Sequence, residues 1–75
     1  MVLLARYELI RETEVEVEYQ FGDPEMDRRL VIRKRDRNCS ATGGMGDPTV
    51  QTLAGKILWE ERNQGSWPPS GMLAT

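Results

Sequence analysis

The sequence predicts an α+β domain in which a three-stranded antiparallel β-meander packs one face against a single helix. Two observations support this. Apolar and polar residues alternate through two early segments that flank a cluster of turn formers at residues 22–27. Residues 48–63 instead place apolar side chains three and four positions apart, which is helical spacing. We therefore expect one domain at residues 1–65 and an irregular, proline-containing C-terminal tail at residues 66–75.

The first two strands are expected at about residues 2–10 and 14–21. Most apolar residues in this stretch occupy odd positions, so both strands would share one apolar face. The pattern lapses at residues 11–13, where a three-residue loop keeps the odd positions on that face. A bend or bulge within one long strand is the alternative. The loop would pair Leu9 with Val15, Tyr7 with Val17 and Ala5 with Tyr19.

The third strand is expected at about residues 29–36. Its pairing with the second strand is strongly specified, because a slip of one residue would bury charged side chains. The predicted pairs are Val17 with Ile32 and Tyr19 with Leu30 on the core face, and Glu16 with Arg33 and Glu14 with Arg35 on the other. The outer face of this hairpin would then be a ladder of ion pairs.

A helix is expected at about residues 48–63, after a glycine-rich loop at residues 36–46. Asp47 suits the N-cap and Pro48 the first helical position, while Gly65 suits a left-handed residue just beyond the end. The apolar stripe that would pack on the sheet consists of Val50, Leu53, Ala54, Ile57 and Leu58.

The overall composition indicates a small cytoplasmic protein. A single cysteine, Cys39, excludes an internal disulfide framework, and the apolar N-terminal run is too short for a signal peptide. No segment has the length of a membrane span. The chain has eight arginines and two lysines, which is typical of a GC-rich genome, and we take its source to be bacterial.

The residue types present give no catalytic constellation, so we expect no enzyme, no cofactor and no metal. Histidine is absent, which removes the commonest general base and metal ligand. Cys39 has no evident activating partner. Residues 43–46 lead into a helix N-terminus, a generic anion site, but their spacing matches neither a P-loop nor a dinucleotide fingerprint. A flexible connector is the preferred interpretation. The glutamates along the first two strands are interpreted as a solvated ion-pair face rather than a cation site.

Trp59 lies opposite the apolar stripe of the predicted helix. A tryptophan there is either covered by another segment or contacts another molecule. The tail residues Trp67, Pro68 and Pro69 offer such a cover, and covering is the preferred interpretation. The same three residues are also a weak match to a polyproline ligand for a partner protein.

The first strand is expected at an edge of the sheet, with Val2, Leu4 and Ile10 on its outer side. Pairing of two such edges would give a six-stranded homodimer and bury these residues. The alternative is a frayed, partly exposed N-terminus.

These observations predict a small non-enzymatic protein-interaction or regulatory module, whose partner is an unknown protein or a second copy of the chain. The alternative function is nucleic-acid binding through residues 28–37, which carry a net charge of +5 within a chain of net charge −2. The arginines of this basic segment are Arg28, Arg29, Arg33, Arg35 and Arg37.

Overall fold

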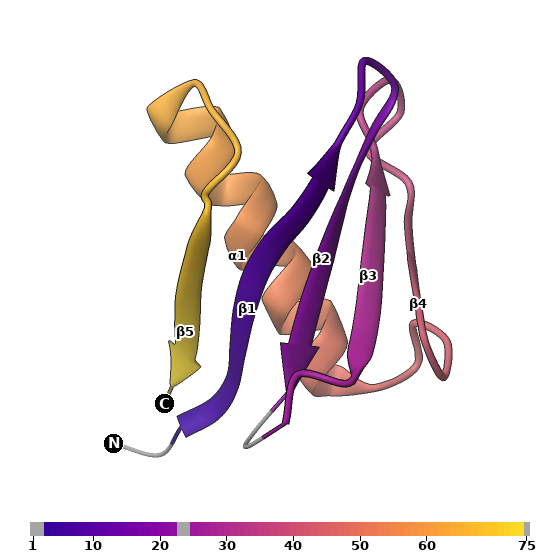
Figure 1. Ribbon diagram of the computed structural model, residues 1–75, viewed down its shortest axis with the longest axis vertical. Coiled ribbons are helices and arrows are strands. Elements are labelled where there is room, and N and C mark those ends of the chain that lie inside the picture. Colours follow the sequence, from indigo (N-terminus) through magenta and orange to yellow (C-terminus); the bar gives the residue numbers. More distant parts are fainter. Residues whose placement is uncertain (1–2, 23–24, 75) are drawn as a thin grey trace.

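The computed structural model describes residues 3–22 and 25–74. Within these residues it contains five strands and one helix, which confirms the α+β class. The elements follow one another as β1 (Leu3–Glu12), β2 (Glu16–Gly22), β3 (Arg28–Arg33), β4 (Cys39–Ala41), α1 (Pro48–Gln64) and β5 (Ser70–Ala74) (Figure 1).

The strands form one antiparallel sheet in the order β4-β3-β2-β1-β5. The predicted meander of β1, β2 and β3 is present at its centre. The prediction of three strands is nevertheless wrong, because a short strand adds to each side of the meander. The irregular tail is also wrong over Ser70–Ala74, since these residues pair with β1 as β5.

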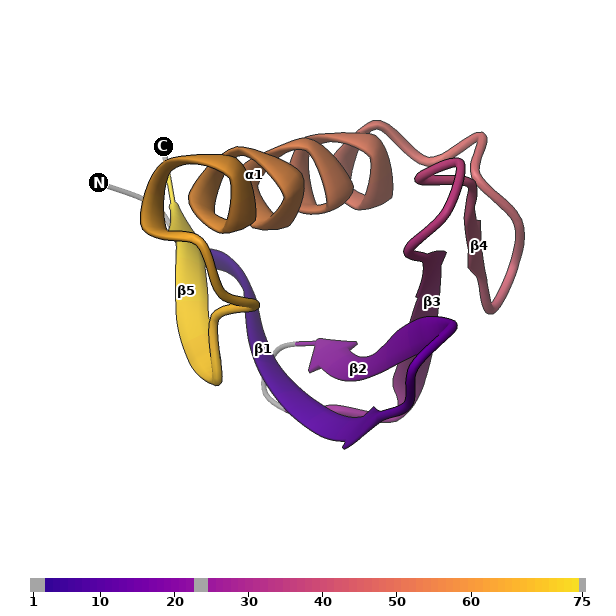
Figure 2. The same cartoon turned by 90° about the horizontal axis from the view of Figure 1, so that it is seen from above.

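The sheet is strongly curved, and the core lies on its concave side. Figure 2 shows the strands bending into a trough, with α1 lying across the open side. Burying one large apolar side chain stabilises a protein by roughly 1.5–3 kcal/mol, so this one cluster is the main source of stability. Its buried members are Tyr7, Val17, Tyr19, Phe21, Leu30, Ile32, Val50, Leu53, Ala54, Ile57 and Leu73.

The register between β2 and β3 is the predicted one. Val17 faces Ile32 and Tyr19 faces Leu30, and all four side chains are buried. The ladder continues past the strands through a hydrogen bond from the Lys34 amide to the Val15 carbonyl (2.8 Å). The alternation of apolar and polar residues along β2, together with Leu30 and Ile32 two positions apart in β3, therefore predicts this pairing from local sequence.

The register between β1 and β2 differs from the prediction. Leu9 faces Tyr19 and Tyr7 faces Phe21, rather than Val15 and Val17. The main cause is that β1 runs on to Glu12, so the turn comes later than predicted. A β-bulge at Ile10 shifts the register by one residue in addition.

The turn after β1 spans residues 13–15, two residues later than predicted, and it contains no glycine. The Thr13 hydroxyl accepts hydrogen bonds from the amides of Val15 (3.2 Å) and Glu16 (3.1 Å). The Thr13 amide donates to the Glu16 carbonyl (2.8 Å). The Thr13 hydroxyl oxygen thus stabilises a tight turn of a kind in which glycine is common.

Both ends of α1 carry the predicted capping residues. The Asp47 carboxylate accepts a hydrogen bond from the Thr49 amide (2.9 Å), and Pro48 occupies the first turn. This bond, together with the Arg28 guanidinium, lowers the pKa of Asp47. Gly65 has a left-handed φ of 79°, and its amide donates to the Glu61 carbonyl (2.8 Å).

Two tyrosines hold the segment after the helix against the core. The Tyr19 hydroxyl donates to the carbonyl of the buried Pro68 (2.7 Å). The Tyr7 ring lies against Gly71, where an added Cβ would be only 2.3 Å from the Tyr7 hydroxyl oxygen. The two rings meet edge to face with centroids 5.9 Å apart. This contact explains why the segment joins the sheet instead of remaining irregular.

Candidate interaction surface

The side of α1 that faces away from the sheet is a surface of its own. Figure 2 shows this side directed away from all five strands. Its exposed residues lie three or four positions apart, so they form one continuous stripe. We call this stripe the outer helix face, and its members are Thr52, Gly55, Trp59, Arg62 and Asn63.

Trp59 is the largest side chain of the outer helix face and keeps 63% of its surface exposed. The expected cover by the C-terminal segment is therefore wrong. Trp67 instead packs partly against the core, with the Arg37 guanidinium 5.9 Å from its ring centroid. The Tyr19 hydrogen bond to Pro68 draws this segment toward the sheet, while Pro69 stays exposed.

Gly55 lies one helical turn before Trp59 and was missed by the sequence analysis. An added Cβ there would meet no atom within 4 Å, and no left-handed φ requires glycine at this position. Glycine inside a helix costs roughly 0.5–1 kcal/mol relative to alanine. The fold itself thus gives no reason for a glycine at position 55. The sequence already shows that this glycine lies four residues before Trp59, which would place both residues on the same side of the helix.

The polar neighbours of Trp59 complete the surface. The Lys56 ammonium pairs with the Glu60 carboxylate (2.9 Å), and the Asn63 side-chain amide donates to the Trp59 carbonyl (2.8 Å). Arg62 lies in the last turn, where a cation complements the helix dipole. The outer helix face therefore joins one aromatic ring to a cation and neutral groups and includes no carboxylate of its own.

The edge-strand hypothesis for β1 is wrong, because β1 is hydrogen-bonded on both sides, to β2 and to β5. Leu4 is partly buried against the core, and Ile10 is 42% exposed at the bulge. Val2 lies outside the described residues. The edge next to β1 is instead β5, whose residue Met72 is 61% exposed.

The basic segment is largely neutralised by nearby carboxylates. The ion pairs join Arg28 to Asp47 (3.2 Å), Arg29 to Glu18 (3.7 Å), Arg33 to Asp36 (3.4 Å) and Arg37 to Glu61. The Arg28 guanidinium also lies 4.9 Å from the Phe21 ring centroid. Arg35 is exposed and has no ion-pair partner among the residues that the structure describes. The basic segment therefore offers much less free positive charge than its sequence suggests.

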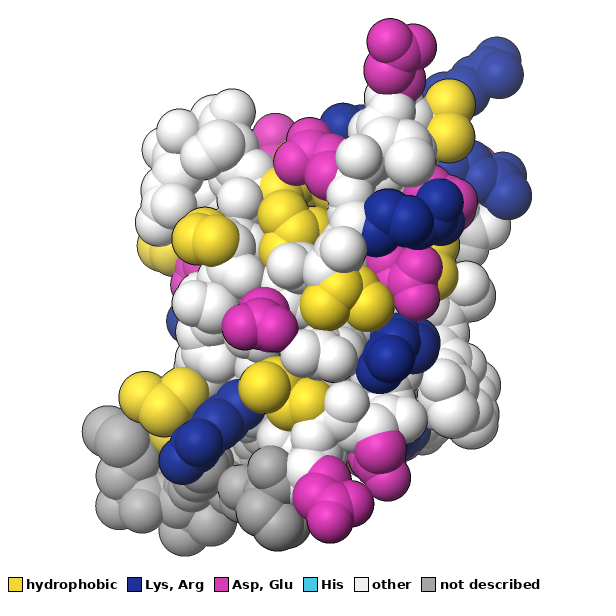
Figure 3. Space-filling model, in the orientation of Figure 1, with side chains coloured by type: hydrophobic (Ala, Val, Ile, Leu, Met, Phe, Trp, Pro, Cys, Tyr) yellow, Lys and Arg dark blue, Asp and Glu magenta, His cyan; other side chains and the backbone are white. Residues whose placement is uncertain are grey.

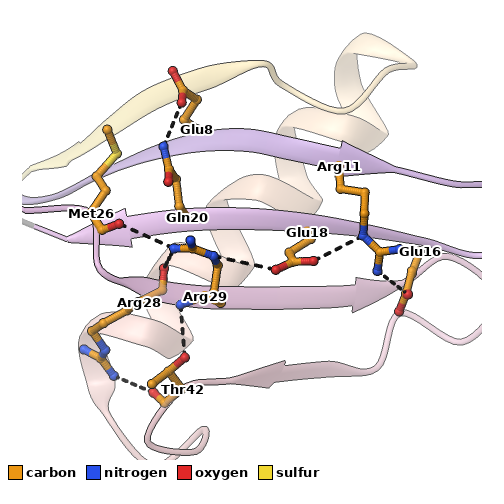
Figure 4. A network of polar contacts seen from close by, with 9 residues as sticks. All are labelled: Glu8, Arg11, Glu16, Glu18, Gln20, Met26, Arg28, Arg29 and Thr42. Atoms are coloured by element: carbon orange, nitrogen blue, oxygen red, sulfur yellow. Dashed lines mark hydrogen bonds and ion pairs between the residues drawn. The ribbon is translucent and has the colours of Figure 1, made fainter.

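The outer sheet face does carry ion pairs, but with partners other than those predicted. Glu16 faces Arg33 in the ladder, yet its carboxylate binds Arg11 (2.7 Å). Arg11 also reaches Glu18 (3.2 Å), as Figure 4 shows. The physical reason is the bulge at Ile10, which pairs Arg11 with Glu18 across β1 and β2. The predicted pair of Glu14 and Arg35 is not part of the ladder, because β2 begins only at Glu16 and β3 ends at Arg33.

Charge on the convex face is mixed rather than segregated. Figure 3 shows acidic and basic side chains interspersed there, with separate apolar side chains between them. Exposed pairs of this kind contribute roughly 0–1 kcal/mol each. The face is therefore a solvated surface of compensating charges, and it has no extended patch of one sign.

The remaining chemical candidates have structural roles. Cys39 lies half-buried in β4, and burial raises the pKa of its thiol, which keeps it protonated. Gly43 and Gly44 have left-handed φ values of 82° and 86°, so they shape the turn before the helix. A hollow of about 240 Å³ beside that helix start is lined by three acidic residues, Glu25, Asp27 and Asp47, and one basic residue, Arg28, whose guanidinium pairs with Asp47. The net negative charge of this lining disfavours a phosphate.

Within the described parts of the chain, no three acidic or cysteine side chains come together as a metal site would require. No helix there combines the length and the apolar character that crossing a membrane demands. The chain matches no protein-family model, no curated protein and no solved structure.

Proposed function

We propose that this protein is a small non-enzymatic interaction module that binds another protein through the outer helix face. The observation that carries the proposal is the 63% exposure of Trp59. Tryptophan supplies a large apolar area with few rotatable bonds, and it is among the residues most enriched at the energetic centres of protein interfaces. Trp59 leaves most of its ring outside the core of its own chain, and a contact with another chain would bury that exposed part.

The surroundings of Trp59 support binding of a protein rather than of a small molecule. The ring lies on a convex helical stripe, and small ligands prefer concave pockets. Gly55 beside it lets another backbone approach closely. Arg62 and Asn63 supply polar groups at the rim, as is usual around an interface centre. This arrangement supports a module that regulates a partner by binding it, rather than by catalysing a reaction.

The test is a quantitative capture experiment with the full chain, Trp59→Ala and Val15→Ala. Val15 is a matched control, because its exposure of 64% is close to that of Trp59 but it lies in the β1–β2 turn. We expect at least one bound protein, a second copy included, to be lost with Trp59→Ala and retained with Val15→Ala. Identical captured proteins and an identical association state for all three chains would contradict the proposal.

Nucleic-acid binding through the basic segment is the weaker candidate. A phosphate would have to displace a carboxylate from four of its five arginines, which removes much of the gain from counterion release. A titration with single-stranded and duplex probes at two salt concentrations tests it. Binding that weakens steeply with salt and is lost with Arg35→Ala, but not with Trp59→Ala, would favour this alternative over the module.

A further inference from the structure

We propose that the outer helix face binds a second copy of itself, with the two α1 helices antiparallel and Trp59 of each copy over Gly55 of the other. This inference rests on the proposed function, since it names the partner of the same surface. Two features that the fold leaves unexplained, an exposed tryptophan and an unneeded helical glycine, lie one turn apart on one stripe. Self-pairing explains both features with a single contact.

The first step is that the surface has both a projection and a notch. Trp59 projects from the helix, whereas Gly55 leaves the backbone uncovered. The Trp59 ring does not fill this notch in its own chain, because an added Cβ at Gly55 would meet no atom within 4 Å. A surface that carries a projecting ring and, one turn away, an open backbone position can pair with a copy of itself, which is what a two-fold symmetric interface requires.

The second step is that the spacing fits a two-fold axis. A two-fold axis that crosses the outer helix face at the height of residue 57, midway along the helix between the two residues, brings Trp59 to the height of Gly55 in the other copy. With a rise of about 1.5 Å per residue, the two indole rings would lie about 6 Å apart along the helix axis. Gly55 carries no side chain, so the Trp59 ring of the other copy can lie directly against the helix backbone there.

The third step is that charge favours the antiparallel arrangement. Arg62 is the cation of the outer helix face, and a parallel pair would place two copies of it side by side. The antiparallel pair separates them by about 15 Å along the axis, which exceeds the Debye length of about 8 Å at physiological ionic strength. Arg62 then lies opposite the neutral Thr52 of the partner copy, and the opposed helix dipoles are also favourable.

The size of the surface sets the expected strength. Five exposed residues on one helix bury less than the roughly 800 Å² per partner of a stable complex. We therefore expect a weak, reversible dimer with a dissociation constant of about 10–100 μM. Such a dimer responds to protein concentration, which suits a regulatory module.

The experiment is sedimentation equilibrium of the full chain between about 5 μM and 1 mM, a range that brackets the expected dissociation constant. The variants are Trp59→Ala, Gly55→Ala and two controls. Gly46→Ala matches the glycine substitution, because Gly46 is also open and lacks a left-handed φ. Met72→Ser matches the removal of an exposed apolar side chain and tests association through the β5 edge.

We expect dimers for the natural chain and both controls, at least thirtyfold weaker association for Trp59→Ala, and about tenfold weaker association for Gly55→Ala. A natural chain that stays monomeric throughout would overturn self-pairing. Dimers that persist in Trp59→Ala but are lost in Met72→Ser would also overturn it and assign the contact to β5.

Failure of this inference can be told apart from failure of the proposed function. A monomeric chain that still captures a different protein in a Trp59-dependent way contradicts only the second copy as partner. A chain that neither self-associates nor binds any protein through Trp59 contradicts both.

Discussion

The two sides of α1 differ in what their residues contact: the inner side packs into the core, and the outer helix face is exposed to solvent. The inner side buries Val50, Leu53, Ala54 and Ile57, and each of these residues packs into the one core of the protein. The outer helix face holds Gly55, where an added side chain would meet open space, and Trp59, whose side chain is mostly exposed. Residues that a fold does not need are where a binding role is best sought, because local choices otherwise agree with the native structure.

The largest expected effect lies on the inner side. Leu53→Ala removes a fully buried side chain from the core, and we expect it to lower the free energy of unfolding by about 2–5 kcal/mol. Urea denaturation followed by circular dichroism measures this. The neighbouring outer variant Thr52→Ala should change stability by less than about 0.5 kcal/mol. Equal losses of unfolding free energy for the two variants would contradict the distinction between a core-forming inner side and an exposed outer helix face.

The next largest effect is expected in the sheet that faces the inner side of α1, where the Tyr7 ring lies against Gly71 of β5. Gly71→Ala forces a Cβ to within 2.3 Å of the Tyr7 hydroxyl oxygen. We expect a loss of about 1–3 kcal/mol from overpacking. The open position Gly46 provides the control substitution Gly46→Ala in the same denaturation assay. A Gly71 variant as stable as the natural chain would mean that β5 is not held against Tyr7.

Alkaline pH perturbs the same contact between Tyr7 and β5 without a substitution. Burial, and then the negative charge of Glu60, raise the pKa of Tyr7 from 10.0 to about 12. The folded state therefore prefers the neutral phenol, and this contribution is complete below pH 10 and is lost as pH rises toward 12. Unfolding free energies measured across this interval should fall more steeply for the natural chain than for Tyr7→Phe. Parallel curves would contradict this.

The smallest expected effect lies on the outer side. Trp59→Ala should change the unfolding free energy of the monomer by less than about 0.5 kcal/mol, because most of the ring is already exposed to water. The same denaturation assay, run at a concentration where the chain is monomeric, checks this. A loss comparable to that of Leu53→Ala would show that Trp59 belongs to the core.

Local chemistry explains which parts of the fold were predictable. Asp47, Pro48 and Gly65 specify the ends of α1 through their own backbone preferences. The alternation of apolar and polar residues along β2, matched by Leu30 and Ile32 on the core side of β3, specifies the β2–β3 register. Both signals lie within short segments, so they need no knowledge of the rest of the chain.

The parts that were missed depend on distant residues. Ser70–Ala74 is a strand because Tyr19 holds Pro68 and Tyr7 fits against Gly71, contacts that no local pattern reveals. Placing β5 beside β1 then removed the predicted edge. The β1–β2 register failed for a different reason, since neither the bulge at Ile10 nor the hydroxyl-stabilised turn at Thr13 has a strong sequence signature.

The candidate surface was half predictable. The off-stripe position of Trp59 followed from helical spacing, but its cover by the tail did not form. Gly55 was legible as an unfavourable residue inside the helix, yet its significance depends on the open space around it. Four of the five arginines of the basic segment suggested a free positive surface in the sequence. In the folded chain, each of the four pairs with a carboxylate.

The central claim is that Gly55 serves association rather than folding, and Gly55→Ala tests it most directly in two readouts on one protein. Alanine favours the helix and meets no atom, so we expect the monomer to gain about 1 kcal/mol in unfolding free energy. The same substitution should weaken self-association about tenfold, because the methyl group fills the notch for Trp59. Unchanged or tighter association in the stabilised variant would contradict the account.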